Sequence, residues 1–515
     1  GGHVAAGRNA YDLVVVGGGI NGAGIARDAA GRGLNVLLCE KDDLASHTSS
    51  WSSKLIHGGL RYLEYYEFRL VREALIEREV LLRAAPHLIK PLTFVLPHSR
   101  EQRPRWMLRI GLFLYDHLGG RKLLAPSRAE DLRAGVYGAP LEDAYPRGFS
   151  YADAWVDDSR LVVANAQAAA EMGAEVRTRT RCDHAERDDA GGWRITLADE
   201  ETGVEETVST RALVNAAGPW VSRFIKDGLK VESKHRVRLV KGSHIVVPAL
   251  YDGDHAYILQ NDDQRIVFAI PYQAGRLTII GTTDLAYEGE PAAVEIDRDE
   301  IDYLCRVVNR YFKKKTSAED IVWTYSGVRP LYDDQSGSPS AVTRDYVFDL
   351  DAPEGEGPLL SVFGGKLTTY RKLAEHAMQK LAPVMGLDDR SWTDDAHLPG
   401  GDIPNADFEG FKAGLGRRYP FLPELMVDRL AHAYGTRAER VLGDARSLAD
   451  LGEHIGCDLY ARELDHLVRE EWARTADDVL WRRTKLGLFV DDEAEARLRA
   501  WFARNEEPER MAVGR

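Results

Sequence analysis

The feature that most constrains the fold is a glycine cluster between two apolar segments, in the stretch YDLVVVGGGINGAGIARDAAGRGLNVLLCEK at residues 11–41. Residues 12–16 and 35–39 are apolar and rich in branched side chains, which predicts two buried parallel strands. The small residues between them predict a helix, so the stretch forms a β-α-β unit. The glycines of its first turn are Gly17, Gly19 and Gly22. At this spacing they allow a tight turn, the approach of a pyrophosphate and close packing of helix on strand.

A carboxylate at the end of the second predicted strand indicates that this unit binds a dinucleotide. Glu40 stands where an acidic side chain accepts hydrogen bonds from an adenosine ribose. The same negative charge would repel a 2′-phosphate, which disfavours NADP. The glycine fingerprint and its carboxylate leave NAD and FAD as the two alternatives.

Three later segments favour FAD. The hydroxyl-rich stretch TSSWSSKLIHGGLRY, residues 48–62, suits further phosphate and ribitol contacts. ALVNAAGPWV, residues 212–221, predicts a strand that ends in small residues, where a ligand can approach. LLSVFGGKLTTYRKLAEHA, residues 359–377, predicts a strand, a glycine turn and a helix, and the start of such a helix stabilises negative charge on a reduced flavin. The candidate cofactor residues in these segments are Thr48, Ser49, Ser53, Lys54, Gly58, Gly218, Gly364, Gly365, Lys366 and Leu367.

Composition excludes several other classes of protein. Of the 515 residues, 44% are hydrophobic and 29% are charged, as in an ordinary globular protein with a large core. The net charge of −14 argues against a nucleic-acid binder. No apolar run is long enough to predict a membrane-spanning helix. The four cysteines are scattered without metal or redox spacing, which favours a reducing intracellular compartment and no metal site.

Long ordered strings along the chain carry a resemblance to a known family. They include VVVGGGINGAGIARDAAGRGL, TSSWSSKLIHGGLRYLEYYEFRLVREAL, FSYADAWVDDSRLVVANA, RLVKGSHIVVP, YILQNDDQRIVFAIPY, DIVWTYSGVRPL, LLSVFGGKLTTYRKLAEHA and ADDVLWRRTKLGLF. With these strings, residues 11–490 resemble the FAD-dependent glycerol-3-phosphate dehydrogenases of aerobic respiration. The departures lie in connecting segments such as 183–210 and 345–357, and in Trp51, which stands where relatives have a small residue.

The resemblance implies an α/β fold with three parts. The first is a discontinuous FAD-binding, Rossmann-like domain formed by residues 11–75, 150–230 and 340–395. The second is a substrate-binding or cap domain with an antiparallel sheet, formed by residues 76–149 and 231–339. The third is an all-α C-terminal domain at residues 400–515, after the Pro- and Gly-containing linker AHLPGGDIPN. The family also implies a homodimer.

A substrate with a phosphate and a secondary alcohol requires cations for the phosphate and a polar group at the alcohol. Arginine suits phosphate because its planar fork donates two parallel hydrogen bonds. By the resemblance, Arg61, Tyr62 and Lys366 lie near the phosphate and Arg329 lies near the C2 oxygen. The remaining substrate-binding candidates are Arg344 and Thr369.

The reaction that the resemblance implies is the oxidation of sn-glycerol 3-phosphate to dihydroxyacetone phosphate by hydride transfer from C2 to flavin N5. The hydroxyl proton requires a base with a pKa near neutrality, which favours histidine. His57 and His244 are the two candidates for this base, and the sequence does not choose between them. Arg329 is the candidate that stabilises the developing alkoxide.

The sequence leaves three functions open for this protein, and they differ in the electron acceptor or in whether turnover occurs. The family members pass the electrons to a membrane quinone of the respiratory chain, which predicts a cytoplasmic protein attached to the inner face of the cell membrane. Residues 104–118, mostly apolar with flanking arginines, predict a helix that lies in the headgroup layer or, alternatively, an ordinary core helix. A soluble oxidase that reduces oxygen to peroxide is the second function. A flavin-binding protein without turnover is the third.

Overall fold

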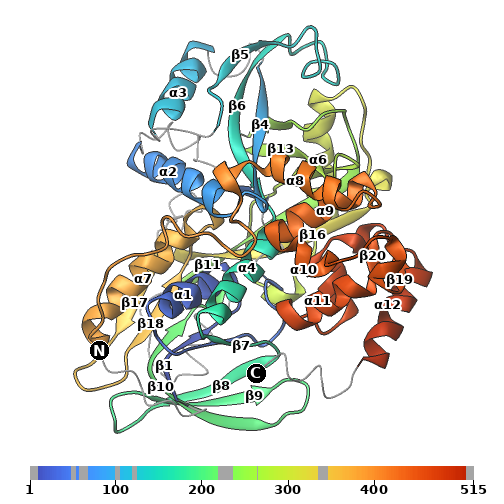
Figure 1. Ribbon diagram of the computed structural model, residues 1–515. Helices are drawn as coiled ribbons and strands as arrows, with labels where there is room; N and C mark the ends of the chain where they lie inside the picture. Colours follow the sequence, from blue (N-terminus) through green and yellow to red (C-terminus); the bar gives the residue numbers. More distant parts are fainter. Residues whose placement is uncertain are drawn as a thin grey trace.

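The computed structural model describes residues 10–47, 54–56, 68–98, 105–118, 124–218, 236–263, 265–333 and 346–505. Two large sheets and a C-terminal group of helices make up this part of the chain (Figure 1). The first sheet lies in the lower half of Figure 1, the second lies in the upper half, and the last helices lie along the right.

The first sheet has eight strands around a parallel centre. β18 (Leu359–Phe363), β10 (Glu205–Asn215), β1 (Ala10–Val16), β2 (Val36–Cys39) and β7 (Glu175–Arg177) pair in this order, all parallel. β17 (Val347–Asp351) pairs antiparallel with β18, and β9 (Trp193–Asp199) links β8 (Thr180–Arg187) to β10. The predicted β-α-β unit is therefore confirmed, and its strands are buried on both faces, as parallel strands require.

Three helices cover one face of this sheet: α1 (Ile20–Gly31), α4 (Asp158–Glu171) and α7 (Tyr370–Met385). α1 packs against both of the others, and its small residues allow the close approach. A Cβ added to Gly24 would lie 2.9 Å from the Tyr370 ring, so the glycine after the fingerprint serves the contact of α1 with α7. The pairing of the sequence-distant helices α1 and α7 brings the start of α7 to the glycine turn.

The second sheet has ten strands. The order is β15 (Leu285–Tyr287), β11 (Arg236–Pro248), β14 (Leu277–Gly281), β13 (Ile266–Tyr272), β12 (Ala256–Gln260), β4 (Ile89–His98), β6 (Arg147–Val156) and β3 (Leu55–Ile56), with β16 (Trp323–Asp333) on β11 and β5 (Arg128–Asp131) on β6. The predicted antiparallel sheet is confirmed, apart from the parallel pair of β12 and β4. α2 (Phe68–Ala84), α3 (Arg105–Leu118) and α6 (Arg298–Tyr311) flank it.

The C-terminal part is helical, as predicted, with one addition. Its helices are α8 (Phe408–Arg418), α9 (Glu424–Tyr434), α10 (Ala438–Leu442), α11 (Ala461–Glu471) and α12 (Asp492–Arg504), around a core of their own. A short hairpin of β19 (His454–Gly456) and β20 (Leu459–Tyr460) departs from the expected all-α domain. Cys457, at its turn, has a φ of 51°, a left-handed conformation that ends any helix.

The domain boundaries drawn from the sequence stay predictions. β6 runs across the expected boundary at residue 150, and it pairs entirely within the second sheet. No helix in the part of the chain that the structure describes is long and apolar enough to cross a membrane.

Candidate active site

The glycine turn after β1 has the geometry that the fingerprint predicts. Gly17 has a φ of +116°, and a Cβ there would lie 2.1 Å from the carbonyl oxygen of Ala216. A Cβ on Gly22 would lie 1.7 Å from the carbonyl oxygen of Gly17, so neither position admits a side chain. Gly19 is the N-cap of α1 and offers no side-chain cap, which leaves the first amides of the helix to a ligand.

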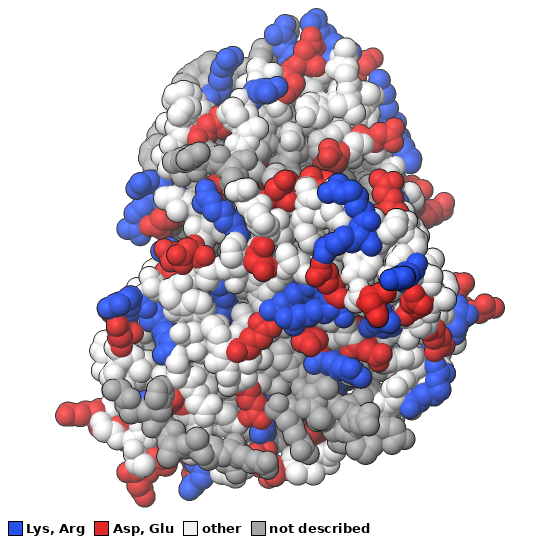
Figure 2. Space-filling view, in the orientation of Figure 1, with Lys and Arg blue, Asp and Glu red and all other residues white. Residues whose placement is uncertain are grey.

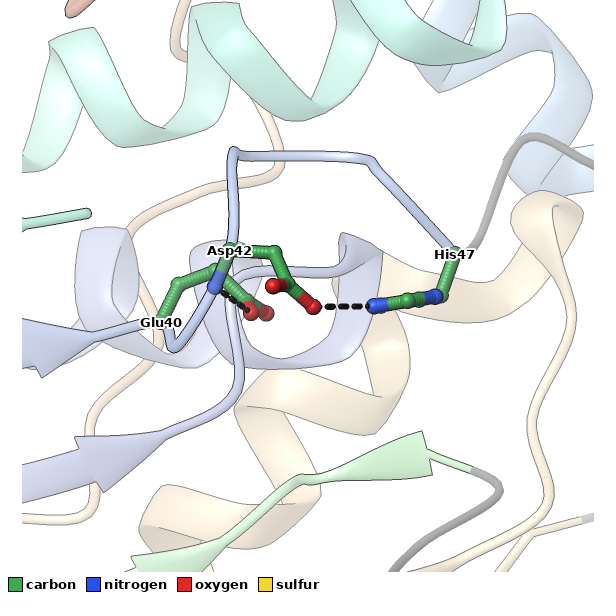
Figure 3. Close-up of side chains that lie close together, drawn as sticks. All are labelled: Glu40, Asp42 and His47. Atoms are coloured by element: carbon green, nitrogen blue, oxygen red, sulfur yellow. Dashed lines mark hydrogen bonds and ion pairs between the residues drawn. The ribbon is translucent and has the colours of Figure 1, made fainter. Parts of the chain in front are cut away.

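Glu40 lies at the end of β2 beside this turn (Figure 3). Its Oε1 accepts a hydrogen bond of 3.0 Å from the Gly18 amide, and its Oε2 accepts one of 2.8 Å from the Asp42 amide. Burial raises the pKa of this carboxyl, and the two amides oppose that rise. A carboxylate fixed in this way, one strand from the glycine turn, fits the predicted contact with an adenosine ribose.

Asp42 and His47, which the sequence argument did not single out, lie next to Glu40 (Figure 3). His47 Nε2 lies 2.7 Å from Asp42 Oδ2, and this contact lowers the pKa of the Asp42 carboxyl. Within the described ranges these three residues form a group whose potential metal-ligand atoms lie within 4.8 Å of one another. The carboxylates of the group already accept hydrogen bonds, and it borders the dinucleotide turn, so we treat it as part of the cofactor site.

Two further glycine turns meet the first one. Gly218 has a φ of +61° and follows β10, and Gly364 and Gly365 have φ values of +80° and +106° between β18 and α7. Asn21, on the first turn of α1, donates from Nδ2 to the Gly364 carbonyl oxygen over 3.1 Å. The predicted strand, glycine turn and helix start is therefore confirmed, and it touches the fingerprint helix directly.

Two polar atoms at this junction are buried and have no hydrogen-bond partner among the described residues. They are Asn21 Oδ1 and Thr369 Oγ1. Thr369 caps α7 after the short helical turn Leu367–Thr369, and Lys366 precedes that turn. Because buried polar groups are normally satisfied, both atoms fit a polar ligand that bridges the two glycine turns. The residues present thus fit FAD: three side-chain-free turns, a fixed carboxylate and unsatisfied polar atoms.

The structure brings Lys54 and His244 into one neighbourhood. Lys54 is buried, its Nζ lies 3.0 Å from Asp158 Oδ1, and it stands 5.3 Å from the centre of the Tyr325 ring. The His244 ring stacks on the Tyr325 ring, with a centroid distance of 4.5 Å. Burial, and then the charge of Lys54, lowers the pKa of His244 to about 3.

Arg329 lies on β16, on the face of the sheet that also carries Tyr325, because the two positions differ by four residues. Its Nη2 lies 3.2 Å from Asp284 Oδ1, and its side chain is 16% exposed. The Cα atoms of Arg329 and Tyr325 are separated by about 13 Å along the strand. His244 pairs with Tyr325 across β11 and β16, so Arg329 and His244 project from different points of the sheet.

The other predicted site residues lie outside the described residues. These are Thr48, Ser49, Ser53, His57, Gly58, Arg61, Tyr62 and Arg344, together with Trp51. Their roles stay predictions.

The C-terminal part contacts the cofactor loop through a charge cluster that the sequence argument missed. Arg483 is buried, and its Nη1 and Nη2 each lie 2.7 Å from the Asp43 carboxylate, three residues beyond Glu40. Arg482 Nε donates to the same carboxylate over 2.8 Å. The WRRTK string thus fixes the C-terminal part to the loop that follows β2, and only the long-range contact reveals this.

This fold and site define a class of protein. Residues 12–371 match the FAD dependent oxidoreductase family, and residues 391–503 match the family described as the C-terminal domain of alpha-glycerophosphate oxidase. The chain therefore belongs to the FAD dependent oxidoreductases, and FAD is its cofactor.

Comparison with individual relatives places the chain in a narrower family of enzymes. The chain is 56% identical to a glycerol-3-phosphate dehydrogenase of Pseudomonas aeruginosa over 98% of its own length and 97% of the relative's. It is 55% identical to the aerobic glycerol-3-phosphate dehydrogenase of Escherichia coli, with 95% and 97% covered. It is also 55% identical to a D-erythritol 1-phosphate dehydrogenase of Brucella abortus, with 95% and 97% covered. The chain belongs to the FAD-dependent glycerol-3-phosphate dehydrogenase family that the sequence indicated.

A solved structure agrees with this assignment. The glycerol-3-phosphate dehydrogenase of Bacillus halodurans in complex with FAD superposes with a TM-score of 0.76 at 27% identity, over 98% of this chain and 93% of that one.

Proposed function

We propose that this protein oxidises the secondary alcohol of sn-glycerol 3-phosphate to dihydroxyacetone phosphate. The observation that supports this most strongly is the 55–56% identity with glycerol-3-phosphate dehydrogenases over nearly the whole chain. The described site supports it through Lys366, which follows the second glycine turn, and through Arg329, a part-buried cation that contacts Asp284. A dianionic phosphate monoester is the substrate class that such cations favour.

In this proposal, different residues of the chain bind the phosphate, stabilise the developing charge and accept the proton. Bound FAD supplies the hydride acceptor for the hydrogen on C2. Lys366, with Arg61 and Tyr62, holds the phosphate, and Thr369 and Arg344 complete the substrate contacts. Arg329 stabilises negative charge on the C2 oxygen, since a cation aimed at developing charge is most effective in a site that excludes water. A histidine, His57 or His244, takes the hydroxyl proton.

The erythritol phosphate relative makes a longer polyol phosphate the second candidate substrate. Its identity of 55% equals that of the Escherichia coli enzyme, so overall similarity does not separate the two substrates. Steady-state kcat/KM for glycerol 3-phosphate and for D-erythritol 1-phosphate, measured with an artificial electron acceptor, distinguishes them. The proposal requires the larger value for glycerol 3-phosphate, and the opposite order overturns it.

For the electron acceptor we propose a membrane quinone, with the protein as a homodimer attached peripherally to the inner face of the cell membrane. α3 supports attachment, because it is mostly apolar and its Phe113 is 60% exposed. Oxygen is the alternative acceptor, which the family name of the C-terminal domain favours. The rate of reduction of a soluble quinone analogue, compared with the rate of peroxide release, decides between them: faster peroxide release overturns the proposal.

A further inference from the structure

A second cavity lies away from the cofactor site. It has a volume of about 540 Å³, which is in the range of small-molecule sites, and it lies between α1, α4, the segment 392–402 and the start of α10. The side chains that carry the argument are Arg27, Met172, Trp392, Asp402, Arg437 and Arg440. We refer to it as the Arg27 cavity.

Arg27 is an unusual lining residue because it is buried without a counter-ion. Its side chain belongs to α1 and is 3% exposed, and its Nη2 makes no hydrogen bond to any described residue. Oδ1 of the neighbouring Asp28 accepts a hydrogen bond from Arg32 Nε over 2.6 Å, and its Oδ2 has no hydrogen-bond partner among the described residues. The guanidinium lies 5.3 Å from the centre of the Trp392 ring, a contact that orients it but gives Nη2 no acceptor. A buried, unpaired cation is costly, so a ligand that pairs with it gains correspondingly.

The carboxylates that line the cavity do not form an ion pair with Arg27 in the described part of the chain. Glu171 is occupied by Arg437, with contacts of 2.5 and 2.8 Å, and Glu439 is occupied by Arg418. Asp402 is exposed at the rim and accepts a hydrogen bond from the Thr436 hydroxyl.

A second cation stands at the same cavity. Arg440 is half-exposed and lies 3.8 Å from Glu470, a loose surface pair of little strength. Figure 2 shows Lys and Arg side chains at the middle of this face, with Asp and Glu side chains directly beside them. Arg27 and Arg440 thus offer two positive charges to one ligand.

We propose that the Arg27 cavity binds a small oxyanion with two negative charges, a phosphate monoester or a dicarboxylate, whose charged group pairs with Arg27. The site is distinct from the substrate site. Arg27 lies about 12 Å along the axis of α1 from Gly19, toward the opposite end of the helix from the glycine turn. The ligand would join the FAD-binding helices α1 and α4 to the C-terminal helices, because residues of both line the cavity.

Equilibrium dialysis of the FAD-loaded enzyme against radiolabelled orthophosphate, at constant ionic strength, tests this proposal. We expect wild-type enzyme to have a phosphate site that Arg27→Met binds at least tenfold more weakly, a change of about 1.4 kcal/mol, whereas phosphate held at the substrate site is bound equally by both proteins. The KM for glycerol 3-phosphate stays unchanged in this variant. Malonate as a competitor separates the two ligand classes, since displacement of phosphate at low malonate concentration indicates a dicarboxylate site.

A second variant keeps the proposal testable if Arg27→Met fails to fold. Met172→Glu adds a negative charge to the cavity wall at a position that is 36% exposed, and it should weaken phosphate binding to a similar degree. Val204→Glu makes the same charge change at an exposed site outside the cavity lining and should bind phosphate as the wild type does. The proposal is overturned if wild-type enzyme and Met172→Glu bind the same amount of phosphate with the same affinity.

Discussion

Arg329 and Lys366 carry positive charge to different parts of the substrate, so their replacement should have different kinetic consequences. We expect Arg329→Ala to lower kcat by more than tenfold with little change in KM, because its charge matters mainly when the C2 oxygen becomes negative. Lys366→Ala should mainly raise KM, because it holds the phosphate in ground and transition states alike.

Steady-state kinetics with an artificial acceptor measures both effects. Arg298→Ala is the matched control, because Arg298 is 73% exposed and pairs only with Asp302 on its own helix. A kcat of Arg329→Ala within about threefold of the wild type, less than 1 kcal/mol, would contradict the role of Arg329.

The pKa of His244, which is lowered to about 3, allows a prediction of how kcat/KM depends on pH. The imidazole is neutral throughout the range from about pH 5 to 8, but it is a weak proton acceptor there. We therefore expect the acidic limb of kcat/KM to come from His57. His57→Gln should remove that limb, and His244→Gln should lower the rate without changing the shape of the profile. A limb that persists in His57→Gln and disappears in His244→Gln would reverse the assignment.

The local geometry that the sequence predicts correctly belongs to residues constrained by a short stretch of chain. Gly17, Gly22 and Glu40 could be assigned because a tight turn and a strand end constrain residue types over a short stretch of chain. Asn21 and Asp43 were missed because their partners, Gly364 and Arg483, lie hundreds of residues away. No spacing rule records such contacts.

The helical turn Asp478–Arg483 is the element that fixes the C-terminal part to the cofactor loop. Arg483 and Asp43 are almost fully buried, and removal of one partner of such a pair costs about 3–5 kcal/mol. We expect Arg483→Met to lower the free energy of unfolding by about that amount and to weaken FAD retention, because Asp43 follows Glu40 closely. Urea unfolding and the flavin-to-protein absorbance ratio measure the two effects.

Arg499→Met is the matched control for this change. Arg499 is 54% exposed and pairs with Glu495 on the surface of α12, where such pairs contribute about 0–1 kcal/mol. Equal losses of stability in the two variants would show that the pair of Arg483 and Asp43 has no special role.

α3 is the element for which the sequence allowed two interpretations, a membrane-surface helix and a core helix. The structure confirms a helix over Arg105–Leu118. Leu112 and Tyr115 are buried in the second sheet's core, and the Tyr115 hydroxyl donates to Asp153, whereas Phe113 is exposed. One face therefore serves the core, and membrane contact stays a prediction for the other.

We expect Phe113→Ser to weaken sedimentation of the enzyme with anionic lipid vesicles, because an exposed aromatic side chain contributes about 1.5–3 kcal/mol when it is buried. Activity with an artificial acceptor should stay unchanged. High salt should weaken binding without abolishing it, since only the contribution of the arginines is screened. Val204→Ser, at another exposed apolar position, is the control, and equal binding by Phe113→Ser and wild-type enzyme would place the contact elsewhere.

At the scale of the whole molecule, the sequence predicts whether a sheet is parallel or antiparallel better than it predicts which strands pair. The parallel unit around β1 follows from apolar runs next to a glycine turn, and the antiparallel sheet follows from short alternating segments. The parallel pairing of β12 with β4 and the place of β6 in the second sheet follow from neither pattern.

The FAD site depends on segments that are far apart in the chain. Its glycine turns and its carboxylate come from the segments around residues 17, 40, 218 and 364. A ligand that binds only the folded chain stabilises it by about 4 kcal/mol at a thousandfold excess over its Kd. We expect removal of FAD to lower the thermal midpoint and readdition to restore it, as followed by circular dichroism. Gly22→Ala, whose Cβ would lie 1.7 Å from the Gly17 carbonyl oxygen, should show no such response to added FAD. A wild-type midpoint that does not move with FAD would mean that these segments hold together without the cofactor.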